Sequence, residues 1–597
     1  MKRVSQFLTA WAAPGLAIGL VTGARWPLVN ASVRGGDAVR IALALAAVGA
    51  AGGALAGAVV ALASKAFGAR REQSPDDGFA REVLASVSCF ALALAGLALS
   101  LSTAMQVGCA LAAVVVAALV RARASEVGRR PLAALVVAVG AVLWSGVTLY
   151  GVAAAPAPTY EPFRGAELGP AHRVVLVGID GADWRRIEPL VAAGRLPALA
   201  RLIGDGVHAP LSTTLPTWSP ILWTTIATGT LAERHGVLDF AETPVPGLHH
   251  SLQRLRKVPL VPSYSGLRSV LRHAFERGLL QERPIGSSHR RCKAVWNVVS
   301  DLGGTAAVVN WFATWPSEAL NGCMVSDRNP ARAAFLVARQ GADRPATRGV
   351  TYPEELLAEL ADLGAPDLHG DVDAILALPM FAELTAEQRT KLHDEADLLH
   401  VFELIHASDA FAAASAAHLL RTRAPDFTAV YVSGVDNVSH RFRQPGVVER
   451  YYEYADGLLA EVVEAAGPDA DVIVVSDHGF EYQDPAHFAH EHGPDGVMVL
   501  CGPSFRAGAT LGPKPSIADV APTVYALLGV PLAGDLDGAP IVEAFQPAVL
   551  EPHPLVTVPS YGSYAPPEGP TAVETAAGDE LQRDVMQKLK ALGYVDE

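Results

Sequence analysis

Acidic and histidine residues follow three apolar runs of the chain at the points where those runs end. Asp180 follows VVLVGI, Asp436 opens DNVSH shortly after YVSG, and Asp477 with His478 ends DVIVVSDHG. A bare carboxylate at the end of a buried strand is costly unless something cationic neutralises it. The three positions therefore predict a site that holds positive charge.

Asp436 and His440 are four residues apart, so a helical turn puts both side chains on one face. With His492 of HEHGPDG they would supply two histidines and one carboxylate, a set that suits zinc and leaves one position open for substrate. The other two carboxylates and His478 are then available to hold a second ion.

Neither spacing identifies a metal site by itself, because DxxxH and DH occur by chance in many chains. Their joint placement at strand ends is what favours ligation. His487 and His490 lie near His492 in the sequence and are rival ligands. We expect both to be solvated loop histidines.

A segment rich in hydroxyl side chains, STTLPTWSPILWTTIATG, lies downstream of the first apolar run. Within it, Ser219 precedes Pro220 and an apparent helix, so its hydroxyl would lie at a helix N-terminus, where an anion is favoured. The ordinary role of such a serine is that of an N-cap. Metal coordination would instead allow it to ionise and act as a nucleophile near neutral pH.

Short runs of β-branched residues alternate with helical segments after residue 172, which is typical of an α/β sheet covered on both faces. The expected strands span 174–180, 306–311, 428–434, 471–477 and 496–502. Ligands bind at the carboxyl ends of the strands in such sheets. The charged segment 350–425 has a helical pattern and is expected to be an insertion or cap.

The first 155 residues are dominated by Ala, Val, Leu and Gly. Five apolar stretches there reach or approach the ~20 residues that a membrane-spanning helix needs. They run over 7–23, 41–64, 82–100, 103–120 and 131–154.

Basic residues in the short connections predict the orientation of these spans. Clusters within 2–3, 65–81 and 121–130 all fall on the cytoplasmic side if five helices cross. The linker 156–171 would then deliver the rest of the chain to the periplasm or exterior. A cleaved signal peptide over 1–23 is the alternative, and it leads to the same placement.

Charge is distributed unevenly between the two halves of the chain. Residues 1–155 carry 13 Lys and Arg against 6 Asp and Glu, and the remainder carries 34 against 55. An acidic half argues against a groove for a nucleic-acid polymer, which needs clustered basic residues. Small phosphorylated molecules remain compatible, because metal ions can supply positive charge locally.

Three cysteines lie outside the apolar stretches, and no CxxC spacing occurs. A disulfide between Cys292 and Cys323 is conceivable in an oxidising compartment, whereas free thiols are the simpler interpretation for these two and Cys501.

Taken together, the motifs resemble the alkaline phosphatase superfamily and, within it, the type I phosphodiesterase and nucleotide pyrophosphatase family. The resemblance covers 172–545 and rests on GIDG, SPILWTTIATG, RHGV, DNVSH, VVSDHGF, HGPDG and IADVAPTVYALLGVP in this order. It implies an alkaline-phosphatase-like, mostly parallel central sheet flanked by helices in a catalytic domain over 172–548. A transmembrane bundle of about five helices would precede that domain, and a tail with a short helix would follow over 549–597.

The resemblance also assigns site residues by position. The Thr228–Gly229 pair, nine residues downstream of the nucleophile in the family, places the nucleophile at Ser219, with Thr217 as the fallback. The ligands implied for one metal ion are Asp180, Ser219, Asp477 and His478, and those for the other are Asp436, His440 and His492. Two divalent ions, zinc or manganese, are expected, and Asn310 is a further candidate for contacting phosphoryl oxygens.

The implied activity is hydrolysis of a phosphodiester or pyrophosphate bond through a phosphoserine, outside the cytoplasm, on a small or lipid-linked phosphorylated substrate. The alternative is an envelope transferase of the phosphoethanolamine or phosphoglycerol type, which shares the layout of membrane helices followed by an outward domain. A sulfatase is disfavoured because the CxPxR sequence that sulfatases need for modification does not occur. A non-catalytic scaffold is a third alternative, disfavoured because every expected ligand is present.

Overall fold

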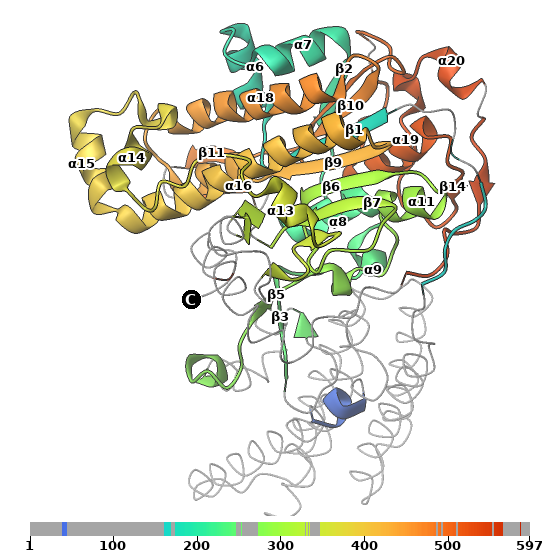
Figure 1. The fold of residues 1–597 in the computed structure, drawn as a ribbon, viewed down its shortest axis with the longest axis horizontal. Helices are drawn as coiled ribbons and strands as arrows, with labels where there is room; N and C mark the ends of the chain where they lie inside the picture. Colours follow the sequence, from blue (N-terminus) through green and yellow to red (C-terminus); the bar gives the residue numbers. More distant parts are fainter. Residues whose placement is uncertain are drawn as a thin grey trace, which may run out of the picture. The chain divides into compact units, whose positions relative to one another are not determined.

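A computed structural model describes most of the chain after residue 172 and little before it (Figure 1). The described residues are 39–44, 160–166, 168, 173–245, 252–253, 273–328, 330–331, 333–334, 347–484, 487–490, 494–508, 511–551, 554–564 and 586. The chain divides into two compact units, one of residues 1–157 and 243–281 and the other of 158–242 and 282–597. All predicted site residues belong to the second unit.

An eight-stranded mixed sheet forms the centre of the second unit, with the strand order β2-β13-β10-β1-β9-β6-β7-β8. The five strands from β10 to β7 run parallel to one another. The strands β13, β2 and β8 pair antiparallel at the two edges. In chain order the strands are β1 (Arg173–Ile179), β2 (Val207–Leu211), β6 (Ala306–Trp311), β7 (Gly322–Ser326), β8 (Thr351–Tyr352), β9 (Phe427–Val432), β10 (Ala470–Val475) and β13 (Gly496–Cys501).

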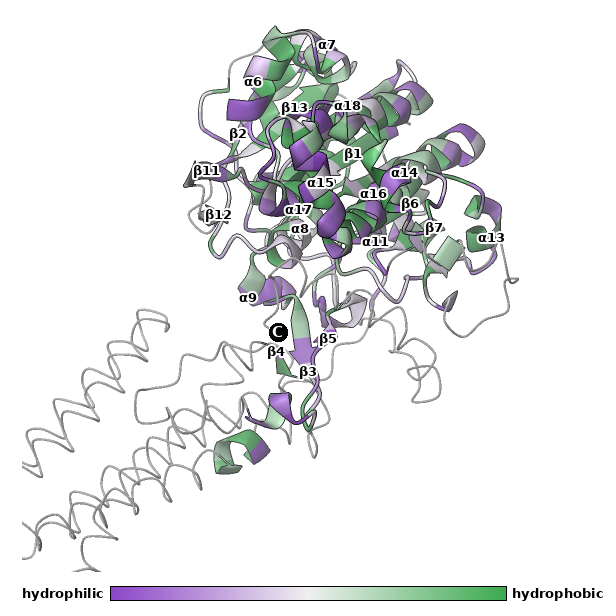
Figure 2. Ribbon diagram, turned by 90° about the vertical axis from the view of Figure 1, so that its left-hand side faces the viewer, coloured by the Kyte–Doolittle hydropathy of each residue, from purple (hydrophilic) through white to green (hydrophobic). Residues whose placement is uncertain are grey.

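Alternation along the strands builds a separate hydrophobic core on each face of the sheet. In β1, Val175, Val177 and Ile179 pack into one core, whereas Val174 and Leu176 pack into the other. Successive side chains of a strand point to opposite faces, so a strand buried on both sides must be apolar throughout. Figure 2 shows the central strands as predominantly hydrophobic and the outlying helix α15 (Ala386–Asp394) as hydrophilic.

The five strands predicted from the sequence are all present, with ends within two residues of the expected ones. Three strands of the sheet are absent from the prediction. β2 has the sequence VHAPL, in which a histidine and Pro210 interrupt the apolar pattern. Proline is tolerated there because β2 is an edge strand. β2 pairs antiparallel with β13, so this side of the sheet departs from the mostly parallel arrangement that was expected.

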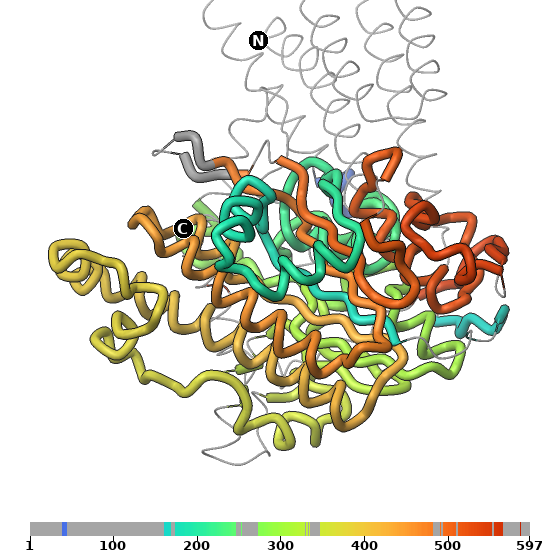
Figure 3. Tube along the Cα trace, turned by 90° about the horizontal axis from the view of Figure 1, so that it is seen from above, coloured from blue at the N-terminus to red at the C-terminus, as the bar shows by residue number. Residues whose placement is uncertain are grey.

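Helices cover both faces of the sheet, as the α/β prediction requires. One face carries α6 (Trp184–Ala192), α7 (Pro197–Asp205), α16 (Ala396–Arg423), α17 (Gly434–Arg441) and α18 (Val447–Ala466). The other carries α8 (Ser219–Thr228), α11 (Val295–Asp301) and α19 (Val520–Leu527). Figure 3 shows α16 and α18 running side by side.

The segment 350–425 is helical, as expected. It contains α13 (Leu356–Leu360), α14 (Val372–Leu376) and α15 before the 28-residue helix α16. The α14–α15 region projects to one side of the sheet in Figure 1, whereas α16 runs back over it and packs on β9 and β6. The last part of this segment is therefore a layer of the fold itself.

After the final sheet strand, α20 (Pro547–Leu550) and β15 (Thr557–Val558) follow, and β15 pairs with β14 (Leu532–Ala533). Tyr561 and Tyr564 are buried.

Cys292, Cys323 and Cys501 are free thiols, so the interpretation without a disulfide is confirmed.

The predicted membrane spans lie outside the described residues, apart from the short helical piece 41–44. Within the part of the chain that the structure describes, we find no helix that is both long and apolar enough to cross a membrane.

Candidate metal centre

The carboxyl ends of three neighbouring parallel strands, β10, β1 and β9, bring the predicted acidic residues together. Asp180 directly follows β1, Asp477 is the second residue after β10, and Asp436 lies in the first turn of α17 after β9. These three residues are at most 2 % exposed. Ligand atoms of Asp180, Asp436 and His478 lie within 4.8 Å of one another, as do those of Asp436, His440 and His490.

Asp180 is oriented by two aromatic side chains that contact the same oxygen. Trp223 Nε1 and Tyr431 Oη donate hydrogen bonds to Asp180 Oδ2 over 3.1 and 2.5 Å. The other oxygen, Oδ1, faces His478 Nε2 at 3.5 Å. One carboxylate oxygen is thus engaged by the protein scaffold, and the other is directed into the cluster.

A backbone contact sets the tautomer of His478. Its Nδ1 lies 3.0 Å from the carbonyl oxygen of Gly479, which can only accept, so Nδ1 carries the proton. Nε2 is then the nitrogen with a lone pair, and it lies 3.5 Å from Asp180 and 3.6 Å from Asp477. A hydrogen bond of this kind, from the ring nitrogen that does not face the metal, orients histidines that ligate metals.

Asp436 and His440 share one face of α17, as their spacing predicts, with 3.4 Å between Asp436 Oδ1 and His440 Nε2. Asp436 can approach β1 closely because Gly181 has no side chain. A Cβ at Gly181 would lie 2.7 Å from Asp436 Cβ, and the φ of +67° at this glycine is one that other residues rarely adopt.

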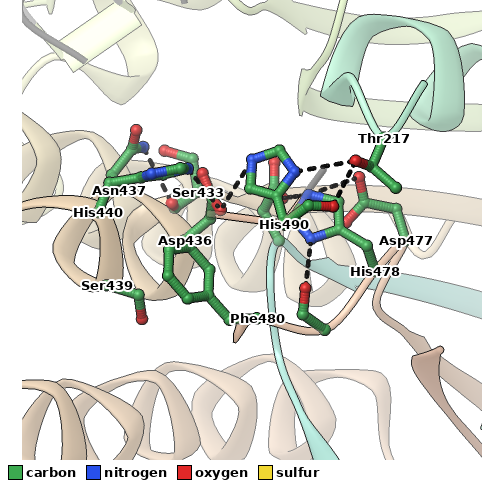
Figure 4. A network of polar contacts seen from close by, with 12 residues as sticks. Thr217, Ser433, Asp436, Asn437, Ser439, His440, Asp477, His478, Phe480 and His490 are labelled. Carbon is green, nitrogen blue, oxygen red and sulfur yellow. Dashed lines mark hydrogen bonds and ion pairs between the residues drawn. The ribbon is translucent and has the colours of Figure 1, made fainter. Parts of the chain in front are cut away.

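His490 is not a solvated loop histidine, so that expectation is wrong. It is 6 % exposed, its ring stacks on His478 at 4.1 Å, and its Nε2 lies 3.9 Å from Asp436 Oδ1 (Figure 4). Thr217 holds it through two contacts, donating to the His490 carbonyl oxygen at 2.6 Å and meeting Nδ1 at 3.1 Å. Thr217 belongs to the hydroxyl-rich segment, which the sequence does mark as a candidate for the site. No sequence pattern indicates that Thr217 contacts His490.

The other histidines of this region are placed less fully. His487 lies in β12 (His487–Ala489), which pairs with β11 (Glu481–Asp484). His492, the predicted third ligand beside Asp436 and His440, lies outside the described residues.

Ser219 is the first residue of α8, as predicted, and is 1 % exposed. Contacts on both sides tie this segment to the cluster, because Thr217 binds His490 and Trp223 binds Asp180. Trp223 is four residues after Ser219 and therefore shares its helix face. The Ser219 hydroxyl oxygen has no hydrogen-bond partner among the described residues, so it does not act as an N-cap.

Asn310, the predicted substrate contact, lies in β6, with β9 between it and β1. It is buried, and its amide nitrogen donates to the backbone carbonyl oxygen of Tyr431 at 3.1 Å. Its backbone has a φ of 58°, a left-handed conformation that asparagine tolerates better than most residues. This contact gives Asn310 a role in orienting the strand that carries Tyr431.

Electrostatics show that the cluster suits a cation. Burial and the charge of Asp436 raise the pKa of Asp180, and burial with the charge of Asp180 raises the pKa of Asp477 well above its usual value. Burial alone would also raise the pKa of Asp436, but the neighbouring His440, His490 and His478 together outweigh burial and lower that pKa.

Several buried polar atoms in the cluster have no hydrogen-bond partner among the described residues. They are Asp180 Oδ1, both carboxylate oxygens of Asp477, and His478 Nε2. Leaving such atoms unpaired is costly, whereas carboxylate oxygens and imidazole nitrogens are ordinary ligands of divalent metals. The donor set therefore fits the metal ions that the resemblance implies.

The chain belongs to the type I phosphodiesterase / nucleotide pyrophosphatase family, whose model matches residues 174–495, more than half of its length. The match begins in β1 and extends past His490, so it includes the whole cluster.

Similarity to individual proteins is more limited. A phosphopentomutase from Symbiobacterium thermophilum is 33 % identical over 96 residues, which is 16 % of this chain and 23 % of that protein. The chain thus matches about a quarter of the length of this relative. Among solved structures, phosphonoacetate hydrolase from Sinorhizobium meliloti is 18 % identical with a TM-score of 0.31, covering 55 % of this chain and 61 % of that one. A mutant of the alkaline phosphatase PafA is 12 % identical with a TM-score of 0.39, and the match covers 63 % of this chain and 100 % of that one.

Replacing Tyr431 with phenylalanine tests how Asp180 is oriented. The variant keeps the ring but removes one of the two donors to Asp180 Oδ2, so we expect metal affinity to fall by about 10-fold or more. Titration of the metal-free chain with Zn²⁺ measures this. Tyr525→Phe is the control, because the Tyr525 hydroxyl is buried without a hydrogen-bond partner in the described part of the chain. An equal loss in both variants would contradict the assignment.

Proposed function

We propose that the protein is a two-metal phosphoester hydrolase that cleaves phosphodiester or pyrophosphate bonds, with Ser219 as the nucleophile. One observation carries the proposal. A buried hydroxyl without a hydrogen-bond partner among the described residues lies on a helix that is fixed to a buried cluster of carboxylates and imidazoles. Family membership supports phosphoester hydrolysis.

The metal ligands are proposed from position and geometry together. Asp180, Ser219, Asp477 and His478 would hold one ion, and Asp436 and His440 would hold the other with His492 and the newly placed His490. Zinc suits the mixture of imidazole and carboxylate ligands, and manganese is the alternative. Divalent ions bound here would supply the positive charge that ionises a serine hydroxyl and stabilises oxygens on phosphorus.

The residues of the chain then act on a substrate held at the cluster. Ser219 Oγ, once its proton has passed to solvent, forms a bond to phosphorus while the bond to the leaving oxygen breaks and that oxygen takes up a proton from water. The result is a phosphoserine that still carries the second substituent on phosphorus. Water then displaces the serine oxygen and releases the phosphorylated product. The positive end of the α8 dipole, at the helix N-terminus, favours negative charge on the phosphoryl oxygens.

The test of function compares two chromogenic substrates with the purified full-length chain in the presence of Zn²⁺ or Mn²⁺. We expect hydrolysis of a bis-aryl phosphate to exceed that of an aryl monophosphate. A preference for the monoester would make the protein a phosphatase. Transfer from a phospholipid donor without hydrolysis of either substrate would favour the envelope transferase.

Ser219→Ala should lower hydrolysis by about 10³-fold or more, because the variant lacks the hydroxyl that would form the covalent intermediate. Wild-type protein that is acid-quenched during turnover of the bis-aryl phosphate should carry an aryl-phosphoryl group on Ser219, which mass spectrometry detects. Thr217→Ala should cost less, since Thr217 orients His490. The reverse order of losses would make Thr217 the nucleophile.

Three histidine variants test the second metal site. His490→Ala and His492→Ala should each reduce the metal retained after dialysis, because each would remove a ligand beside Asp436. His487→Ala is the control and should retain both ions. Full retention in His490→Ala would remove His490 from the ligand set and leave His492 as the third ligand.

We also propose that the apolar stretches within residues 1–155 anchor the protein in a membrane, with the metal centre on the outer side. The distribution of basic residues supports this orientation. Protease added to intact spheroplasts should then degrade the second unit while a cytoplasmic marker survives. Degradation only after lysis would contradict it.

A further inference from the structure

Asp409 is a buried carboxylate in the middle of α16 and is not one of the residues gathered at the metal centre. Its side chain is 0 % exposed. Oδ1 accepts a hydrogen bond from the backbone N–H of Ser433 at 2.9 Å, and Oδ2 accepts one from the N–H of Gly434 at 2.8 Å. A charged group at this depth needs a structural or functional reason.

Both backbone donors lie at the start of α17, the helix that carries Asp436 and His440. Gly434 is the first residue of α17, and Ser433 is its N-cap position. Ser433 makes no side-chain capping hydrogen bond. A carboxylate from another helix therefore satisfies N–H groups that the helix itself leaves open, and it places a negative charge where the helix dipole favours one.

The same carboxylate is tied to α18. Tyr451 Oη donates to Asp409 Oδ2 at 3.0 Å. Gly434 makes this close approach possible, because a Cβ there would lie 2.0 Å from the Tyr451 hydroxyl oxygen. Asp409 thus links three helices at one point, and that point is two residues before Asp436.

We infer that Asp409 is a positioning residue for the half of the metal centre that contains Asp436 and His440. This inference rests on the proposed function. The start of α17 is fixed on one side by Asp409 and on the other by the backbone, where Asp436 N–H donates to the Asp180 carbonyl oxygen at 3.1 Å. Asp436 and His440 lie on the same helix, with 3.4 Å between Asp436 Oδ1 and His440 Nε2. A small shift of α17 therefore moves both ligands relative to β1.

The second unit contains a closely matched arrangement without a metal ligand. Asp456 in α18 is 3 % exposed and accepts hydrogen bonds from Ala198 N–H and Leu199 N–H at 2.9 and 2.8 Å. These donors lie in the first turn of α7, an outer helix that carries no predicted site residue. Asp456→Asn therefore loses a comparable helix-capping charge away from the metal centre.

The experiment titrates the metal-free full-length chain with Zn²⁺ by calorimetry and compares Asp409→Asn with Asp456→Asn. Asp409→Asn should bind one ion like the wild type and the second about 10- to 100-fold more weakly. High Zn²⁺ should restore hydrolysis, because every proposed ligand is intact. Asp456→Asn should bind both ions like the wild type, even if its melting temperature falls as much as that of Asp409→Asn.

Tyr451→Phe separates the carboxylate from the tyrosine. It removes one contact of Asp409 but keeps both hydrogen bonds to α17, so we expect it to retain both ions.

Three results would overturn the inference. Wild-type affinity for both ions in Asp409→Asn would do so directly, and an equal loss in Asp456→Asn would show a general effect of destabilisation. A wild-type chain that bound no ion would remove the proposed function together with this inference.

Discussion

The burial of three carboxylates at the carboxyl ends of neighbouring inner strands is the constraint on which the rest of the site depends. Asp180, Asp436 and Asp477 are almost fully buried, and burial with mutual repulsion raises the pKa values of two of them. Such a cluster is costly to fold unless cations bind it. The surrounding scaffold therefore has to hold these three carboxyl groups close together before any ion arrives.

Each carboxylate is held by a different part of the fold. Trp223 and Tyr431 engage one oxygen of Asp180, and Asp409 fixes the start of the helix that carries Asp436. The segment beyond Asp477 is fastened by Asp183, whose carboxylate accepts from Phe480 N–H at 3.2 Å. Both sheet faces contribute, because α8 lies on one and α17 on the other.

The sequence permits prediction of the features that depend on local pattern. The five β-branched strands, the helix beginning at Ser219 and the shared face of Asp436 and His440 all follow from periodicity and spacing. Contacts between distant segments do not follow from it. His490 is held by Thr217, 273 residues earlier, and β2 becomes a strand only because β13 pairs with it. No local sequence pattern predicts the Thr217–His490 contact or the pairing of β2 with β13.

The burial of α8 along its whole length has a consequence for the proposed reaction, in which Ser219 is the nucleophile. All ten of its residues are buried, and Trp223 locks the helix to Asp180. A serine on such an element has little freedom to follow a departing or incoming group. The stepwise changes of geometry at phosphorus would then be accommodated by movement of the phosphoryl group and its substituents past a stationary oxygen, with the protein acting as the fixed frame.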